Sequence, residues 1–139
     1  MRRVVITGLG VISPIGNNAD EVTASLKAGK TGIRFMQEFA DHNFKCQVGA
    51  KPDVDPAEHV DKRVYRFMSE GAGWCYMALE QAIAASGIGE NDISNPRTGI
   101  IMGSGGPSAG TIVNAADITR DKGPRRIGPF AVPKAMSST

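Results

Sequence analysis

Two short apolar runs, each followed by glycines, constrain the fold of this chain more than any other feature. Residues 4–7 are mostly β-branched and precede Gly8 and Gly10, and residues 98–102 lead into a glycine-rich turn at 103–106. Short β-branched runs are typical of strands buried on both faces of a parallel sheet. Helical patterns lie between the two runs, and the order strand, helix, strand predicts an α/β fold.

The segment between these runs carries two helical patterns. Asn18 and Asp20 are favourable capping residues before residues 21–28, and Gly29 stands where a helix commonly ends. After Asp61, apolar residues recur at steps of three and four up to Gly87, which predicts one long and mostly buried helix.

Two glycines interrupt the longer helical pattern. Gly71 and Gly73 each cost a helix roughly 1 kcal/mol relative to alanine, so their presence needs a reason. A closely packed neighbour is such a reason, and we expect a second helix to cross at these positions.

The remaining segments are less regular. A short strand is predicted around residues 46–48, weak helical character over 108–119 and a basic loop over 120–128. Residues 137–139 offer neither the glycine nor the proline that usually ends a helix. We therefore expect residues 1–139 to be one incomplete domain, truncated on its C-terminal side.

Charge and cysteine content exclude several classes of protein. The net charge of +2 is too small for a general polyanion-binding protein, although residues 97–139 carry a net charge of +4. Cys46 and Cys75 form no Cys-x-x-Cys motif, which argues against zinc and against a disulfide framework. No apolar run approaches the roughly 20 residues of a membrane span. These features predict a soluble, cytoplasmic protein that binds neither nucleic acid nor membrane.

The glycine motifs do not predict a nucleotide site. Ser13 stands where a dinucleotide fingerprint would place its third glycine after Gly8 and Gly10. A tight turn off a sheet edge is the favoured interpretation there. For residues 103–106, a functional role and a plain turn stay open as alternatives.

No catalytic constellation can be assembled from the residues themselves. His42 and His59 lie in polar segments without a nucleophile or carboxylate at a telling spacing. Cys75 falls on the apolar side of the predicted helix, which indicates packing rather than reactivity. We find no Ser/His/Asp, Cys/His or metal-ligand set.

Two clusters of cations remain. Lys62, Arg63 and Arg66 begin the long helical pattern, where the helix dipole disfavours each positive charge by roughly 0.3 to 1 kcal/mol. A solvated first turn, partly neutralised by Asp61, is the plainer interpretation. If the fold joined the two clusters, they would form a patch suited to an acidic protein. The second cluster consists of Arg120, Lys122, Arg125 and Arg126.

Five motifs in order resemble the β-ketoacyl-[acyl-carrier-protein] synthase family, most closely its synthase I branch. The motifs are residues 3–10 with Ser13 and Gly16, residues 61–69, residues 80–83, residues 103–106, and residues 127–130 with 134–136. The resemblance implies a thiolase-like α/β fold of α-β-α-β-α layers, of which this chain supplies most of the N-terminal half, and a homodimer.

The resemblance also implies a reaction. An acyl group passes from acyl carrier protein to a cysteine, and decarboxylative condensation with malonyl carrier protein follows. Phosphopantetheine arrives on the carrier, and no metal or other cofactor is implied. The family's catalytic cysteine, two histidines and lysine are expected beyond residue 139. Neither Cys46 nor Cys75 matches the nucleophile, so no catalytic residue is assigned within this chain.

The resemblance further assigns binding residues. Gly106 matches a position at the gate of the acyl pocket, and Met136 one that walls this pocket across the dimer. Pro107 departs from the family, in which a further glycine is typical. Basic positions on which the family docks its acidic carrier protein are matched by Lys62, Arg63, Arg66, Lys122 and Arg125.

Two alternatives stay open. Within the family, the chain could come from a synthase II or from a polyketide ketosynthase, including inactive chain-length partners. From another class, it could be a non-catalytic carrier-docking module, although the unfinished last element speaks against this alternative.

Overall fold

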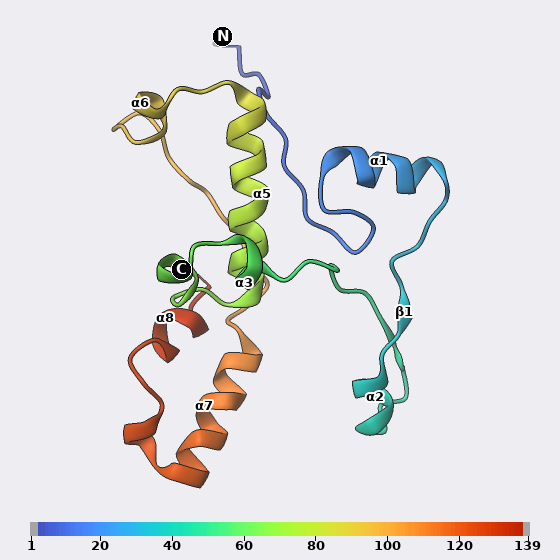
Figure 1. Cartoon of the computed structure of the whole chain (residues 1–139), viewed down its shortest axis with the longest axis vertical. Helices are drawn as coiled ribbons and strands as arrows, with labels where there is room; N and C mark the ends of the chain where they lie inside the picture. Colours follow the sequence, from blue (N-terminus) through green and yellow to red (C-terminus); the bar gives the residue numbers. More distant parts are fainter. Residues whose placement is uncertain (1–2, 138–139) are drawn as a thin grey trace. The chain divides into compact units, whose positions relative to one another are not determined.

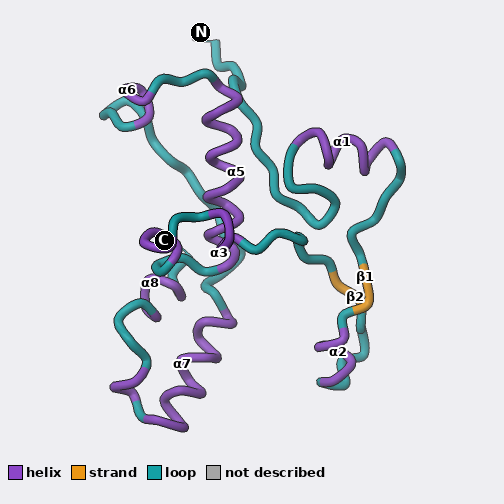
Figure 2. Tube along the Cα trace, in the orientation of Figure 1, coloured by secondary structure: helices purple, strands orange, loops and turns teal. Residues whose placement is uncertain are grey.

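The computed structural model describes residues 3–137 and is built mainly from helices and loops (Figures 1 and 2). These residues form two compact units. Unit 1 comprises residues 3–54 and 78–87, and unit 2 comprises residues 55–77 and 88–137. The helix α5 (Glu70–Ser86) contributes residues to both units, which are described separately below.

Unit 1 begins its regular structure with α1 (Ala19–Lys27), which confirms the first predicted helix. The Asn18 side chain accepts a hydrogen bond from the Glu21 backbone N–H at 2.9 Å. In return, a Glu21 carboxylate oxygen accepts from the Asn17 backbone N–H at 2.8 Å. This reciprocal cap satisfies donors that the first turn of a helix leaves free. Gly29 follows the helix at φ +63°, a backbone conformation that favours glycine.

A two-stranded antiparallel ribbon follows in unit 1 (Figure 2). It pairs β1 (Arg34–Phe35) with β2 (Val48–Gly49), with α2 (Gln37–Asp41) between the two strands. The strand predicted around residues 46–48 is therefore confirmed, displaced by about one residue.

Gly8 and Gly10 lie against the backbone of α5 in unit 1. A Cβ atom on Gly8 would overlap the carbonyl oxygen of Ala82, and a Cβ atom on Gly10 would overlap that of Ala78. Neither glycine has a positive φ. The predicted tight turn is therefore wrong as their reason, because these glycines allow close packing between the chain and a helix.

The Gln81 side chain of α5 joins the same packing. Its amide nitrogen donates to the carbonyl oxygen of Asn17 at 2.8 Å, and its amide oxygen accepts from the Val11 backbone N–H at 3.2 Å. These bonds satisfy backbone groups of a segment that has no ladder partner there.

Unit 2 starts with α3 (Pro56–His59) and α4 (Lys62–Tyr65), followed by α5. The single long helix predicted after Asp61 is thus wrong, because the chain interrupts it after Tyr65. The Ser69 hydroxyl accepts from the Ala72 backbone N–H at 3.3 Å, the position of a cap at the start of a helix. A capping residue inside an apolar pattern starts a new helix here. The expectation of a mostly buried helix is also wrong, since Gly73 is the residue of α5 classed as buried.

The two glycines of α5 have different surroundings in unit 2. A Cβ atom on Gly73 would stand 2.5 Å from Pro56 Cβ and 2.9 Å from Tyr65 Cε2. The predicted close neighbour is therefore confirmed at Gly73, and it consists of α3 and α4 rather than a long crossing helix. A Cβ atom on Gly71 would meet nothing within 4 Å, so the prediction is wrong there.

The rest of unit 2 contains α6 (Glu90–Ile93), α7 (Ala109–Lys122), the 3-10 helix η1 (Pro124–Arg126) and α8 (Ala131–Ala135). Helix α7 confirms the helical segment predicted over 108–119 and extends it into the predicted basic loop. It packs against η1 and α8. The Ser108 backbone N–H donates to the carbonyl oxygen of Ala135 at 3.0 Å, which joins the start of α7 to the end of α8.

Neither apolar run predicted as a strand forms one. Within residues 3–137, the ladder formed by β1 and β2 is the sheet present, so the predicted parallel sheet is not found. Val4 is 94% exposed and Ile101 is 99% exposed. An extended segment becomes a strand only when another strand bonds to it, and no described segment does so for these runs.

The two glycines of α5 provide a matched test of packing. We expect Gly73→Ala to lower the free energy of unfolding of the chain by about 1 to 3 kcal/mol, because the added methyl group meets Pro56. Gly71→Ala should be neutral or stabilising by up to about 1 kcal/mol, because it gains helix propensity in open space. Thermal unfolding followed by circular dichroism measures both. Equal effects of the two substitutions would contradict the described packing of Gly73.

Candidate functional site: two clusters of cations

The first predicted cluster lies on and just after α4. Lys62 and Arg63 belong to the helix, and Arg66 follows as its C-terminal cap. The Asp61 carboxylate accepts from the Arg63 backbone N–H at 2.7 Å and lies 3.3 Å from the Arg63 guanidinium. One carboxylate therefore caps the helix and partly offsets the positive charge at its start.

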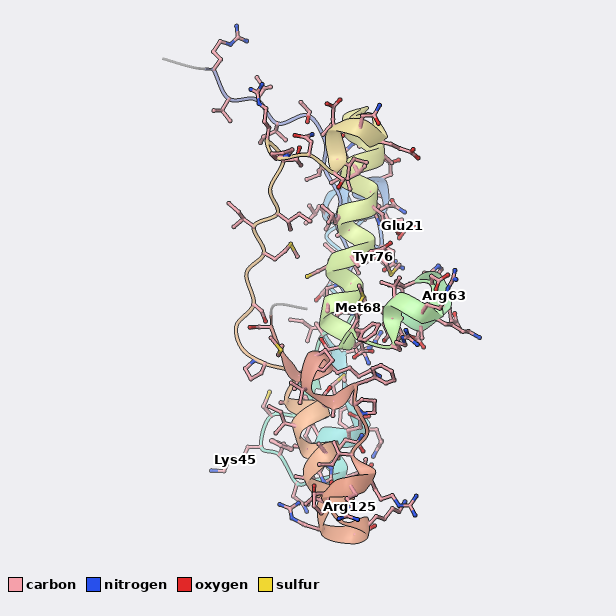
Figure 3. All side chains as sticks on the ribbon, turned by 90° about the vertical axis from the view of Figure 1, so that its left-hand side faces the viewer. Glu21, Lys45, Arg63, Met68, Tyr76 and Arg125 are labelled. Carbon is pink, nitrogen blue, oxygen red and sulfur yellow. The ribbon has the colours of Figure 1, made fainter. Side chains whose placement is uncertain are left out.

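The pairing with Arg63 lowers the pKa of the Asp61 carboxyl group. The Arg63 side-chain hydrogen bond, followed by the Arg63 backbone hydrogen bond, holds the pKa of Asp61 below its usual value of 3.8. The Arg63 side chain is 87% exposed and points away from the ribbon (Figure 3). Its positive charge is thus accessible to a partner even though Asp61 lies beside it.

Arg66 has different surroundings from the other cations of the cluster. Its guanidinium carbon lies 4.8 Å from the centre of the Phe67 ring and 5.3 Å from the centre of the Phe130 ring. The two rings meet edge to face, with their centres 5.1 Å apart. Phe130 comes directly before α8, so this contact joins segments that are far apart in the sequence.

The second predicted cluster lies at the C-terminal end of α7 and in η1. Lys122 is the last residue of that helix and Arg125 belongs to η1, and both are exposed. Within this cluster Arg120 pairs with Asp117 at 2.7 Å. Figure 3 shows Arg63 and Arg125 at separate positions of unit 2, with neither side chain pointing toward the other. The structure therefore presents two basic regions rather than one continuous cluster.

The two residues predicted for an acyl pocket also lie in unit 2. Gly106 sits in an exposed loop, where the Ser104 hydroxyl donates to its carbonyl oxygen at 2.8 Å. A Cβ atom on Gly106 would meet nothing within 4 Å. Met136 follows α8 as its C-terminal cap and is 49% exposed. Their assignment to a pocket stays a prediction.

Sequence reasoning missed a polar hollow of about 300 Å³ in unit 1. The loop around Pro14 and the start of β1 line it. Three of its charged groups have partners, because Arg34 forms an ion pair with Asp53 and the Glu21 carboxylate takes part in the α1 cap. The lining carries acidic and basic side chains in equal number and favours no ligand of one charge, so we assign no site there.

The remaining candidates for reactive groups are metal ligands and the two cysteines. Within residues 3–137, no three His, Cys, Asp or Glu side chains lie close enough together to hold a metal ion. Cys46 and Cys75 are both free and exposed, so the predicted packing role of Cys75 is wrong. No helix in the same range has the length and apolar character needed to cross a membrane.

Comparison with known proteins decides the family. The sequence profile described as "Beta-ketoacyl synthase, N-terminal domain" matches residues 1–139. The chain belongs to the β-ketoacyl synthase family. The family resemblance carried by the five motifs is thereby confirmed.

Two relatives of this chain are named 3-oxoacyl-[acyl-carrier-protein] synthase 1. It is 46% identical to 3-oxoacyl-[acyl-carrier-protein] synthase 1 of Haemophilus influenzae, over 100% of this chain and 34% of that protein. The synthase 1 of Escherichia coli (strain K12) is 44% identical, over 99% of this chain and 34% of its own length. The chain thus spans about a third of the length of these relatives.

Solved structures of β-ketoacyl synthases share the fold. The ishigamide ketosynthase/chain length factor matches with a TM-score of 0.83 and 27% identity, over 98% of this chain and 34% of that one. A β-ketoacyl synthase from Burkholderia phymatum matches with a TM-score of 0.79 and 28% identity, over 98% and 34% of the two chains. The predicted thiolase-like fold class is confirmed, although residues 4–7 and 98–102 form no strands here.

The pairing of Asp61 with Arg63 predicts a dependence of stability on pH. Because the folded-state pKa of Asp61 lies below its unfolded value, its contribution is present above about pH 4 and is lost as the pH falls through the folded pKa. Asp61→Asn keeps a capping side chain but removes the charge. We expect its melting temperature to lie below that of the parent chain at pH 6, with the gap closing toward pH 2. A gap that stays constant over this range would contradict the pairing.

Proposed function

We propose that this chain is the N-terminal part of a condensing enzyme of fatty-acid elongation, a 3-oxoacyl-[acyl-carrier-protein] synthase I. The observation that carries the proposal is the identity of 46% and 44% to two synthases 1 over essentially the whole chain. Because the chain covers about a third of these relatives, the activity is proposed for a protein of their length that contains it. This protein is called the full-length synthase below.

The proposed reaction has two steps. A cysteine thiolate attacks the acyl thioester of acyl carrier protein, and the phosphopantetheine thiol of the carrier leaves. Malonyl carrier protein then loses carbon dioxide, and the resulting carbanion attacks the acyl-cysteine thioester and displaces the thiolate. The product is longer by two carbons. Hydrogen-bond donors stabilise the oxyanion that forms in each attack.

Residues of the present chain are proposed to bind rather than to react. Lys62 and Arg63 on α4 would attract the acidic carrier. Lys122 at the end of α7 and Arg125 in η1 would do the same. Their separation in unit 2 fits a carrier that bridges two basic regions. Arg66 completes the proposed docking set, and Gly106 and Met136 are proposed to border the acyl pocket.

The enzyme is further proposed to act as a cytoplasmic homodimer without a cofactor of its own. Two relatives with other names are less similar to this chain than the synthases 1 of Haemophilus influenzae and Escherichia coli. Identity is 37% to a synthase 2 of Coxiella burnetii and 27% to the ketosynthase/chain length factor above. A synthase I is therefore favoured over a synthase II or a polyketide chain-length partner.

The proposal can be tested by separating the chain from the full-length synthase. We expect the 139-residue chain to form no condensation product from acyl and malonyl carrier proteins, and Cys46→Ser and Cys75→Ser to change nothing. The full-length synthase should form a 3-oxoacyl product, detected by mass spectrometry. Product from the chain that disappears with either cysteine, or a full-length synthase without product, would overturn the proposal.

Carrier docking is tested by charge reversal at Arg63. In the full-length synthase, Arg63→Glu should raise KM for carrier-bound substrate by about tenfold at low salt, because it replaces attraction with repulsion. The difference from the parent enzyme should shrink as the salt concentration rises. The control is Arg97→Glu, which makes the same charge change at another exposed arginine of unit 2. If both variants showed the same salt-dependent KM, Arg63 would be an ordinary solvated residue.

A further inference from the structure

Arg66 differs from the other proposed docking cations because it contacts two aromatic rings. Its guanidinium lies 4.8 Å from the Phe67 ring centre and 5.3 Å from the Phe130 ring centre. Cation–π contacts at exposed sites each shift an equilibrium by roughly 2- to 5-fold. By contrast, the Arg63 guanidinium donates to the carboxylate of Asp61.

The two rings that Arg66 contacts belong to different segments, because Phe67 follows α4 and Phe130 stands at the start of α8. Phe130 precedes the helix, and its carbonyl oxygen accepts from the Lys134 backbone N–H at 3.0 Å. The other end of α8 is joined to α7, because the Ala135 carbonyl oxygen accepts from the Ser108 backbone N–H at 3.0 Å. A helix of five residues is too short to be stable by itself, so these contacts at its two ends hold it in place.

We propose that Arg66 is a positioning residue that holds the start of α8 against the end of α4. The inference rests on the proposed function, because α8 leads into Met136, which is proposed to border the acyl pocket. Arg66 then affects the reaction through α8 as well as through its charge. Its removal acts on substrates that carry no carrier protein at all.

Arginine suits this role better than lysine. A guanidinium is planar and stacks over aromatic faces, whereas an ammonium group is a compact and strongly hydrated charge. Arg66→Lys therefore keeps the positive charge and weakens the ring contact. Docking by charge alone would tolerate this substitution.

The first test measures the order of α8 directly and needs no activity. In the full-length synthase, Arg66→Lys should speed amide hydrogen exchange of a peptide covering residues 130–136 by about 3-fold or more. Phe130→Leu should have a similar effect, and Phe130→Tyr, which keeps the ring, a smaller one. The control Arg97→Lys makes the same chemical change at an exposed arginine of unit 2.

The second test uses the same variants with an acyl N-acetylcysteamine thioester, a substrate without carrier protein. Arg66→Lys and Phe130→Leu should each lower kcat by about 3- to 10-fold. The double variant should lose little more than the worse single variant, because both substitutions break one contact.

Three outcomes decide the inference. Exchange at residues 130–136 that is the same in Arg66→Lys and Arg97→Lys would overturn it, and so would losses in the double variant that multiply. An effect of Arg66→Lys confined to KM for carrier-bound substrate would also overturn it, and would leave Arg66 as a docking cation. A parent synthase that forms no condensation product would instead refute the proposed function, and the exchange measurement would still decide the role of Arg66.

Discussion

The close approach of two chain segments to helix α5 is the constraint on which the rest of the structure depends. In unit 1 the backbone at Gly8 and Gly10 lies against the helix backbone, and in unit 2 Gly73 receives Pro56 at a distance that no side chain would allow. In unit 1 the carbonyl oxygens of the helix backbone leave no room for compensation by rotamer changes, whereas Gly73 in unit 2 meets the side chains of Pro56 and Tyr65. Each unit therefore has its register on α5 set by a glycine.

Arg63 and Arg66 of unit 2 differ in the contacts that their side chains make. Asp61 offsets charge at the start of α4 while it leaves the Arg63 side chain exposed. Arg66, three residues later, lies over two rings that belong to different segments. Arg63 and Arg66 thus carry the same charge and lie three residues apart, but their side chains have different contacts. One is available to a partner in solution, whereas the other contributes to the packing of α8.

The helices could be predicted from the sequence where their signals are local. Asn18 and Gly29 delimit α1 because capping depends on neighbouring residues alone. The break before α5 was missed, because the apolar periodicity continues across Ser69 and conceals a cap. Residues 4–7 and 98–102 were predicted as strands and form none in the structure. A strand needs a hydrogen-bonded partner strand, which the local sequence does not reveal. The two clusters of cations are evident in the sequence, whereas their docking role is implied by the family resemblance. The contact of Arg66 with Phe130 joins positions that only the fold brings together.

Unit 1 is assembled from two stretches of sequence, and this has a consequence for the order in which the chain can fold during synthesis. The bond between Val11 and Gln81 spans 70 positions. At roughly 5 to 20 residues per second, a ribosome needs about 4 to 14 s to add them. Throughout that interval Gly8 and Gly10 have been made without the helix that packs against them. Unit 1 therefore cannot complete its packing until the second stretch, with Gln81, has been made.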